Sequence, residues 1–527
     1  MRDINDIIKE VWPRIRKRHL FPELPAPTCA EGEDRVGLDI KGKQISISRS
    51  FVEKMARSLE PREVVEGLLD HAVSHYLYCP WDFATQLRLY GEAKKLLKDK
   101  ELALKATDTF MDVVADTHCV SRNDTPLPNI YKNLDRGILD EAIHALYQKI
   151  WGVDLGVSGR DEGVSRKLAR LPYLDRSRWN ETIRRFVQVI EPLLKKEEGT
   201  REMSKPNPMG KHGAQGYSAQ EIAEGVKALA AEVDEPSEFR EIFQDLKTEF
   251  LEVPELGENA MGLGPGRSVD ADLLYYMKLA QNYTLPIRKR PVEKSGSLYP
   301  ERHTPWEVGR PYQDIDPWTS FGKIMPGITQ VWERREGEVQ GEDEGTPDCI
   351  VVIDSSGSMT DPRRHLSYAV LGAACACEAY LRNGARVAVY NFSDAFAGGR
   401  RVLPYTDVRK DIYATICHYY GGGTQLLVES IEDLQTGQVP DIFLITDMQI
   451  TNLRTLIEYF NGCKNRVTTV HIGDNKEVRA FRHAAAARKR VTIYPVEKKE
   501  DIPRIVLGKL REYITTTRLS LPKLWER

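Results

Sequence analysis

A short motif rich in hydroxyl and carboxylate side chains stands in the C-terminal third of the chain. The run Asp354-Ser355-Ser356-Gly357-Ser358 directly follows the apolar stretch CIVVI and matches the pattern D-x-S-x-S. A loop that turns away from a strand end can point alternate side chains into one cavity, here offering two hydroxyl oxygens and a carboxylate. Hard oxygen ligands in a small octahedral site suit Mg²⁺, which keeps some of its water. The motif therefore predicts a magnesium site at a strand end.

Two further pieces of the same chemistry follow in order. Gly421-Gly422-Gly423-Thr424 is a flexible loop that ends in a hydroxyl, and Thr446-Asp447 ends the apolar run IFLI. Each piece alone has a plainer explanation, because Asp354 and Ser356 could cap the following helix and the glycines could form an ordinary loop. Their combination, each at a predicted strand end, favours the metal site.

The full set, D-x-S-x-S then G-G-T then T-D, resembles the metal-ion-dependent adhesion site of von Willebrand factor A domains, over residues 346–515. The resemblance implies that Ser356, Ser358 and Thr424 supply hydroxyl oxygens to Mg²⁺ or Mn²⁺. It also implies that Asp354 and Asp447 bind the ion directly or through water. The sixth position would stay open for an Asp or Glu carboxylate of a partner protein.

A second candidate site lies on a helix predicted over residues 62–79, REVVEGLLDHAVSHYLYC, which Pro80 ends. Beside its apolar face, His71 and His75 have the i, i+4 spacing at which two imidazoles can hold one zinc ion. Cys79 cannot join them, because the helix rises about 12 Å between His71 and Cys79. A third ligand must therefore come from another element.

The stretch LKATDTFMDVVADTHCV places Asp108, Asp112 and Asp116 at every fourth position of another predicted helix. Like charges stacked in this way disfavour a helix unless a cation or a buried partner compensates. Asp116 is the preferred third ligand, with Asp112 or His118 as alternatives. The plainer explanation is that hydrogen bonds satisfy the histidines and that Asp116 pairs with an arginine.

The N-terminal region resembles minimal zincin-type metallopeptidases, in which a strand and a short helix precede the helix that carries the histidines. The family motif is H-E-x-x-H, and its glutamate is the general base. Ala72 occupies that position here, and Glu66 and Asp70 project from other sides of the helix. The resemblance therefore implies metal binding and argues against proteolysis.

The elements that must position the first site alternate between short apolar runs and amphipathic stretches from residue 349 onward. Continuously apolar strands between helices are typical of a doubly wound parallel sheet, in which ligands lie at the carboxyl ends of the strands. We predict an α/β protein: a Rossmann-like C-terminal sheet of the von Willebrand A kind, preceded by a mainly helical α+β region.

The domain boundaries follow from shifts in composition. Polar, Gly- and Pro-rich stretches mark linkers, and Ser218 with Glu221 forms a capping box that opens a helix. The stretch from Thr284 to Pro326 is rich in Pro, Trp and Tyr without a clear period, which is typical of a segment that lies over a neighbouring domain. The predicted parts are 1–195 (zincin-like), 196–217 (linker), 218–345 (helical and irregular), 346–515 (von Willebrand A) and 516–527 (tail).

Composition restricts the function classes. The chain has 527 residues, 41% hydrophobic and 29% charged, with a net charge of −3, so we expect no general attraction to nucleic acid. Its eight cysteines form no C-x-x-C pair, which favours reduced thiols. The N-terminal residues lack the apolar core of a signal peptide, and no apolar run approaches the ~20 residues of a membrane span. We expect a soluble cytoplasmic protein without a membrane partner.

The order of the two regions resembles prokaryotic proteins in which a metallopeptidase-like region precedes a von Willebrand A domain and which are often paired with MoxR-type AAA+ ATPases. The chain has no G-x-x-x-x-G-K-[ST] loop, so ATP-driven work must come from a partner. The resemblance implies a non-enzymatic adaptor. The alternative is a zinc-dependent hydrolase that uses His71, His75 and Asp116, and an insertase-like role, as in metal-chelatase subunits, ranks lower.

Overall fold

The computed structural model describes two compact units. The described residues are 3–30, 37–39, 44–157, 162–198, 217–250, 261–263, 270–283, 290–293, 298–310, 312–320, 324–336, 342–435, 439–473, 475–485, 491–496 and 501. The first unit comprises Met1–Tyr283, Ser355–Ala374 and Val408–Gly423, and the second comprises Thr284–Asp354, Cys375–Asp407 and Thr424–Arg527. Most of the predicted linker 196–217 and the tail 516–527 lie outside the described residues.

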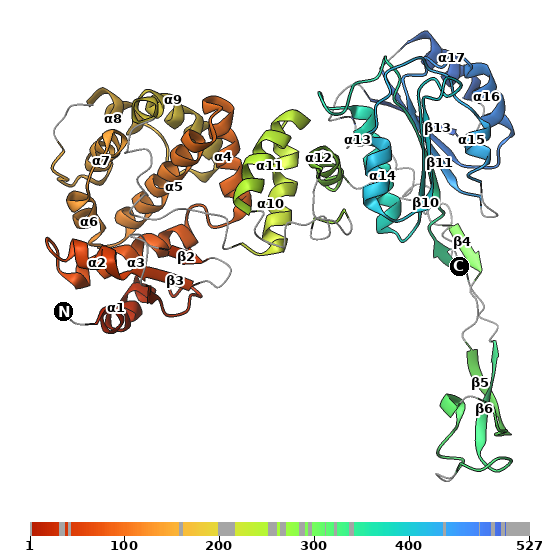
Figure 1. Ribbon diagram of the computed structural model, residues 1–527, viewed down its shortest axis with the longest axis horizontal. Coiled ribbons are helices and arrows are strands. Elements are labelled where there is room, and N and C mark those ends of the chain that lie inside the picture. The colour runs from red at the N-terminus through yellow and green to blue at the C-terminus, as the bar shows by residue number, and fades with distance from the viewer. Residues whose placement is uncertain are drawn as a thin grey trace, which may run out of the picture. The chain divides into compact units, whose positions relative to one another are not determined.

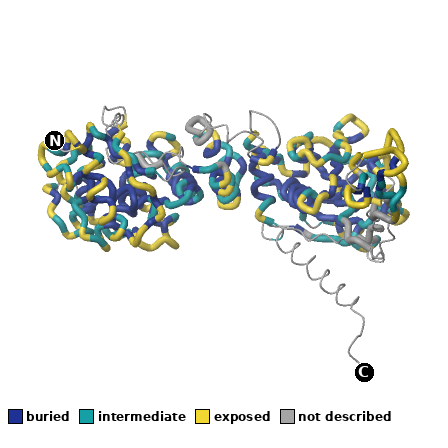
Figure 2. The backbone as a smooth tube through the Cα atoms, turned by 90° about the horizontal axis from the view of Figure 1, so that it is seen from below, coloured by how far each residue is buried: buried dark blue, intermediate teal, exposed yellow. Residues whose placement is uncertain are grey.

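The first unit begins with a mainly helical region and a small sheet, as predicted (Figure 1). Strand β3 (Gln44–Ser48) lies between β1 (Thr28–Ala30), to which it is parallel, and β2 (Gly37–Asp39), to which it is antiparallel. The helices are α1 (Ile4–Arg18), α2 (Arg49–Met55), α3 (Pro61–Leu77), α4 (Phe83–Leu97), α5 (Lys100–Arg122), α6 (Leu127–Asn133), α7 (Ile138–Trp151), α8 (Glu162–Leu168) and α9 (Trp179–Glu197). Figure 2 shows the buried residues in the interior of this region.

Helix α3 is enclosed on several sides, because α1, α2, α5, α6 and β3 all contact it. Every residue from Val64 to His75 is buried, including the polar ones. Buried charges need partners, and α1 supplies them for two carboxylates. The Arg18 guanidinium pairs with both Glu66 and Asp70, and His19 Nε2 lies 2.9 Å from Asp70 Oδ1. Glu66 and Asp70 are thus both engaged with α1.

Three further helices follow in the first unit: α10 (Ala219–Glu232), α11 (Pro236–Phe250) and α12 (Ala271–Ala280). The predicted capping box is confirmed at α10, where Ser218 Oγ accepts from Glu221 N at 3.3 Å and Glu221 Oε2 accepts from Ser218 N at 2.8 Å. Sequence analysis did not anticipate α11. Rings of α11 and α12 pack together, with Phe239 and Tyr275 centroids 5.3 Å apart.

The second unit begins with two antiparallel ladders, in a stretch where the sequence showed no period. Strand β4 (Arg290–Glu293) pairs with β7 (Glu342–Gly345), and β5 (Leu298–Pro305) pairs with β6 (Gln330–Glu336). Asp316 organises the connection between β5 and β6 by accepting from Trp318 N at 3.0 Å and contacting His303 Nε2 at 2.8 Å. Trp318 itself is 89% exposed, whereas Trp306 is buried.

The core of the second unit is a six-stranded sheet in the order β10-β9-β8-β11-β12-β13. The predicted parallel arrangement is confirmed for β8 (Cys349–Asp354), β9 (Val387–Phe392), β11 (Asp441–Thr446), β12 (Val467–Ile472) and β13 (Val491–Val496). Strands β8, β9 and β11 are buried along their whole length. Leu456, Phe460, Val478 and Phe481 pack into the same core from α16 (Leu453–Gly462) and α17 (Lys476–Ala485), and Ile431 does so from α15 (Glu429–Glu432) (Figure 1). The remaining helices of the C-terminal region are α13 (Tyr368–Arg382) and α14 (Arg409–Ile416).

One strand corrects the expectation of an all-parallel sheet. Strand β10 (Arg400–Thr406) pairs antiparallel with β9 at the edge, with a register irregularity between Leu403 and Thr406. Its sequence RRVLPYT is charged, contains a proline and is exposed or half-buried throughout, which is typical of an edge strand. The search for continuously apolar runs missed β10 because only strands buried on both faces show that pattern.

Over the residues that the structure describes, no helix combines the length and the apolar character that crossing a membrane requires.

We expect Asp70→Asn to lower the free energy of unfolding of the helical region by ~1–3 kcal/mol, because it removes the charge of one of the two carboxylates that hold the largely buried Arg18. Urea denaturation followed by circular dichroism measures the change. Glu162→Gln removes a charge from an exposed pair with Arg166 and is the control, with no measurable change expected because solvent screens such a pair. Equal effects of the two substitutions would show that the buried network adds no stability.

Candidate metal centres

The residues of the predicted magnesium site leave the sheet at adjacent strand ends. Strands β8 and β11 are parallel and in register, with Ile353 opposite Ile445, so Asp354 and Thr446 follow at the same edge. Thr446 Oγ1 donates to Asp354 Oδ2 at 2.7 Å, and both residues are buried. This hydrogen bond fixes the carboxylate that opens the D-x-S-x-S loop (residues 354–358).

The turn after β11 holds Asp447 in place. Asn475 Nδ2 donates to Asp447 O at 2.6 Å, and Gln449 N donates to Asp447 Oδ1 at 3.0 Å. Met448 has a φ of 63° and is fully buried, although a left-handed conformation costs a non-glycine residue about 1–2 kcal/mol. Its backbone N–H donates to Thr446 Oγ1 at 3.0 Å. Backbone strain of this kind collects at functional sites.

Thr424 lies beside the same edge of the sheet. Its carbonyl oxygen accepts from both N and Oγ1 of Thr451, each at 2.8 Å. The next residue, Gln425, exchanges backbone hydrogen bonds with the segment that follows β9, to Ser393 O at 2.8 Å and from Ala395 N at 3.0 Å. Thr424 is therefore anchored between the loops that follow β9 and β11.

Within the first unit, the D-x-S-x-S loop and the glycine loop are joined by two backbone hydrogen bonds. Gly421 N donates to Ser355 O at 3.0 Å, and Gly357 N donates to Gly422 O at 2.8 Å. Both donors favour glycine. A Cβ at Gly357 would lie 3.3 Å from Gly422 O, and Gly421 has a φ of 65° with the Tyr419 ring 3.0 Å from a Cβ position. Two of the three predicted motifs, the D-x-S-x-S loop and the glycine loop, are therefore in direct contact.

The donor set fits a hard divalent cation. Ser356 Oγ and Ser358 Oγ lie 3.2 Å apart, close to the ~2.9 Å that separates neighbouring ligands of an octahedral ion with ~2.1 Å bonds. Ser356 is buried, whereas Ser358 is exposed, so one side of the pair faces solvent. Of the predicted ligands, Ser356 and Ser358 belong to the first unit, and Asp354, Thr424 and Asp447 belong to the second. Their binding of an ion stays a prediction.

The two histidines of α3 meet a carboxylate of α5. Ligand atoms of His71, His75 and Asp112 all lie within 4.8 Å of one another, and all three residues are buried. His75 Nε2 is 3.2 Å from Asp112 Oδ1, and the rings of His71 and His75 meet edge to face with centroids 4.5 Å apart. Tetrahedral zinc with ~2.0–2.1 Å bonds needs ligands ~3.3 Å apart, so this cluster fits a zinc ion.

Asp116, the preferred third ligand from sequence, lies behind His71 instead. Its Oδ1 is 2.8 Å from His71 Nδ1, and the Tyr131 hydroxyl donates to its other oxygen. Burial raises the pKa of Asp116, while the neighbouring His71 lowers it. The geometry therefore favours Asp112 as the ligand and Asp116 as the group that orients His71. The other alternative, His118, stacks on Tyr78 with centroids 4.8 Å apart.

Both imidazoles are oriented as metal ligands usually are. A metal-binding histidine typically donates its second ring nitrogen to a carboxylate or a backbone carbonyl. His71 Nδ1 lies against Asp116, and His75 Nδ1 lies 2.6 Å from Cys79 O, which leaves Nε2 of each ring as the ligand nitrogen. Ala72, in the position of the zincin glutamate, is 1% exposed.

The structure also groups His19, Asp70 and Cys119, which sequence analysis did not single out. Burial raises the pKa of the Cys119 thiol to about 12, so it is inert as a nucleophile. Arg18 already neutralises Asp70, which favours an ion-pair network over a metal site. No sequence signal could have revealed the group, because its members come from three separate helices or helix ends.

No protein-family model and no curated protein matches this sequence. Among solved structures, the chain is similar to a protein described as von Willebrand factor type A from Catenulispora acidiphila, with 18% identity and a TM-score of 0.24. The similarity covers 32% of this chain and 43% of that one, so less than half of the other protein's length is matched.

Acid lability of the helical region is expected from His144, whose ring packs on Tyr131 at 5.4 Å. Burial, with a smaller contribution from Arg136, lowers the pKa of His144 from 6.5 to about 3. Below pH ~6.5 the imidazole is therefore protonated in the unfolded chain but not in the folded one. The free energy of unfolding falls as the pH drops from 6.5 toward 3, by at most ~1.4 kcal/mol per pH unit.

His144→Gln should flatten this part of the stability profile, measured by urea denaturation at several pH values. The same change at exposed His418 should leave the slope as it is. An unchanged slope in His144→Gln would show that this histidine is protonated in the folded state.

Proposed function

We propose that this protein is a metal-dependent adaptor that binds a partner protein through a Mg²⁺ or Mn²⁺ ion at the D-x-S-x-S loop. The observation that carries the proposal is the hydrogen bond from Thr446 to Asp354 at the ends of β8 and β11. It unites the first and last of the predicted motifs at the sheet edge where ligands of parallel α/β sheets bind. The hydroxyl pair of Ser356 and Ser358 supports the same ion.

The chemistry of the ion favours binding of a carboxylate. An open coordination position on a divalent ion rewards an incoming charged oxygen that replaces water. The loops 358–364, 396–401 and 421–425 would form the rest of the contact. Phe396 is 61% exposed and offers an aromatic anchor, whereas Tyr419 and Tyr420 are half-buried. By the resemblance in domain order, the proposed partner is a MoxR-type AAA+ ATPase that presents an Asp or a Glu.

Asp354→Asn should weaken Mg²⁺ binding roughly ten- to hundred-fold, because the amide keeps the hydrogen bond with Thr446 but loses the charge that the ion needs. The matched control is Asp441→Asn at the opposite end of β11. Asp441 is also buried and accepts one hydroxyl hydrogen bond, from Tyr380 at 2.8 Å. Calorimetric Mg²⁺ titration separates them, and equal affinities in the two variants would refute the assignment of Asp354.

Removal of the ion should abolish partner binding. We expect a pull-down from native lysate with the full chain to recover its partner in Mg²⁺ and to lose it in EDTA or with Asp354→Asn. Asp441→Asn should still recover it. If the same proteins are recovered with and without EDTA, the ion only stiffens the loops and the adaptor proposal fails.

A second candidate function belongs to the helical region, where His71, His75 and Asp112 form a buried cluster whose histidines are both oriented from behind. We propose that this cluster holds a structural zinc ion. A hydrolase would need a base to take a proton from metal-bound water, which contributes ~10²–10⁴-fold to the rate. Ala72 provides none, so the alternative of a zinc-dependent peptidase is the weaker one.

Purified protein should contain zinc, measured by mass spectrometry of the metal, and should cleave no peptide library. We expect Asp112→Asn to remove a ligand and Asp116→Asn to weaken zinc affinity roughly 10–100-fold through the orientation of His71. Asp108→Asn, on the same stripe of α5 but outside the cluster, is the control. Zinc-dependent cleavage that His71→Ala abolishes would instead establish the hydrolase.

A further inference from the structure

The segment between the D-x-S-x-S loop and α13 has an unusual source of hydrogen bonds. Residues 361–367 form no helix or strand, yet Pro362 and Ser367 are buried. Buried backbone groups need partners. Many of the partners in this segment are side chains of α11, of the residue before it and of α12.

Tyr276 of α12 makes three of these contacts. Its hydroxyl lies 3.1 Å from Pro362 O and 3.3 Å from His365 O as a donor, and it accepts from Ser367 N at 2.9 Å. The side chain is fully buried. Burial also raises the pKa of Tyr276, so the hydroxyl keeps its proton and can serve as donor and acceptor at once.

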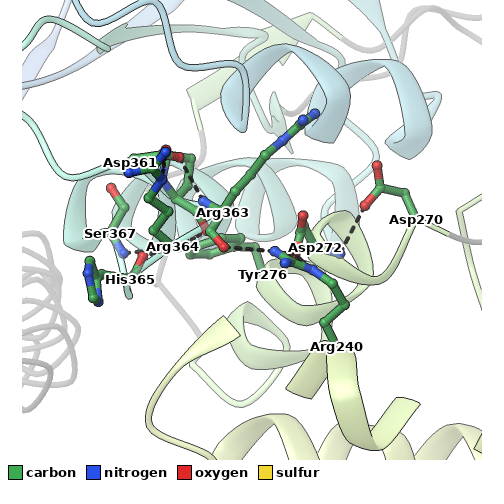
Figure 3. A network of polar contacts seen from close by, with 10 residues as sticks. Arg240, Asp270, Asp272, Tyr276, Asp361, Arg363, Arg364, His365 and Ser367 are labelled. Carbon is green, nitrogen blue, oxygen red and sulfur yellow. Dashed lines mark hydrogen bonds and ion pairs between the residues drawn. The ribbon is translucent and has the colours of Figure 1, made fainter. Parts of the chain in front are cut away.

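Arg240 extends the same pattern (Figure 3), and Glu235 adds a further contact. Arg240 Nη2 donates to Arg363 O at 2.7 Å, while Nε and Nη2 hold Asp272 Oδ1 at 3.0 and 2.6 Å. Glu235 Oε2 accepts from Leu366 N at 3.0 Å. Asp272 is itself placed at the start of α12, where its N–H donates to Asp270 Oδ1 at 2.9 Å. Arg240 therefore ties α11, α12 and the loop segment together.

The contacts lie close in the chain to the proposed ligands. Asp361, where the segment begins, is only a few residues after Ser358, and Met359 between them is buried and donates to Ser356 O at 3.0 Å. At its other end, Ser367 caps α13 by accepting from Leu371 N at 2.9 Å. Only two residues separate Ser358 from Asp361, and one of them, Met359, is anchored to Ser356. A shift of the segment 361–367 is therefore expected to displace Ser358.

We propose that the side chains of Glu235, Arg240 and Tyr276 form a clasp that positions the D-x-S-x-S loop for metal binding and couples it to helices α11 and α12. Tyr276 and Arg240 are positioning residues, since neither is a ligand. The inference rests on the proposed metal site. The two serine hydroxyls already lie near ligand spacing with the clasp closed, so the clasp stabilises the binding-competent loop and its loss weakens binding. By linkage, the ion must in turn tighten the clasp.

The test uses the full chain and Mn²⁺ as the probe, with affinity from calorimetry and clasp integrity from hydrogen exchange. The amides of Leu366 and Ser367 donate directly to the clasp, so their exchange reports on it. We expect Mn²⁺ to slow exchange in residues 361–367 of the wild type. Tyr276→Phe should speed that exchange, abolish the slowing by Mn²⁺ and weaken Mn²⁺ affinity about three- to ten-fold.

Tyr380→Phe is the matched control, because it also removes a buried tyrosine hydroxyl that bonds once, to Asp441 at 2.8 Å. It should leave Mn²⁺ affinity and the exchange of residues 361–367 unchanged. If Tyr276→Phe does not fold, Arg240→Lys keeps the charge beside Asp272 and breaks the bond to Arg363 O, with the same expected pattern.

The outcomes separate the two proposals. If the wild type binds Mn²⁺ and Asp354→Asn does not, but Tyr276→Phe or Arg240→Lys binds like the wild type, the clasp is overturned and the metal site stands. If the wild type binds no Mn²⁺, or Asp354→Asn binds equally well, the metal site itself fails and the clasp with it.

Discussion

The in-register parallel pairing of β8 with β11 is the constraint on which the C-terminal site depends. It brings Asp354 and Thr446 to one edge of the sheet, where the threonine hydroxyl holds the carboxylate. Asp447 follows Thr446 at the same edge. Thr424 is anchored between the loops after β9 and β11, and the glycine loop bonds to the backbone of the D-x-S-x-S loop. The strained Met448 shows that the turn after β11 is held against its local preference.

The helical region follows the same physics with a different result. Helix α3 is enclosed on so many sides that its polar stripe cannot reach water, and an isolated buried charge is very costly. One part of the stripe, Glu66 and Asp70, is neutralised by Arg18. The other part, His71 and His75, meets Asp112 and Asp116 of α5. Helix α3 therefore carries an ion-pair network and a candidate metal cluster next to each other. Residues that face α1 form the network, and residues that face α5 form the cluster.

The proposed clasp gives α11 and α12 a role beyond the stability of the first unit. Backbone groups of the segment before α13 are satisfied by side chains from α11 and α12, so the free energies of loop position and helix packing are not independent. If a partner binds through an ion at the D-x-S-x-S loop, hydrogen bonds of this kind are needed for the binding to affect other parts of the chain. The coupling is physical because it passes through specific hydrogen bonds that are either made or broken.

The sequence alone determined the elements whose burial leaves a periodic trace. Continuously apolar runs predicted the buried parallel strands, the helical period predicted α3, and Ser218 with Glu221 predicted the start of α10. It also placed two of the three motifs of the predicted metal site at strand ends, whereas the glycine loop follows helix α14. Tertiary structure shows which carboxylate of the α5 stripe faces His75. Asp112 Oδ1 lies 3.2 Å from His75 Nε2, whereas Asp116 contacts His71 Nδ1. Both carboxylates occupy one stripe of α5, so spacing alone could not separate them, and zinc binding there stays a prediction. Tertiary structure also decided the direction of β10, the pairing of Arg18 with Asp70, and the clasp of Tyr276 on Ser367. These contacts join residues far apart in the chain, and local spacing holds no information about which distant partner satisfies a buried polar group.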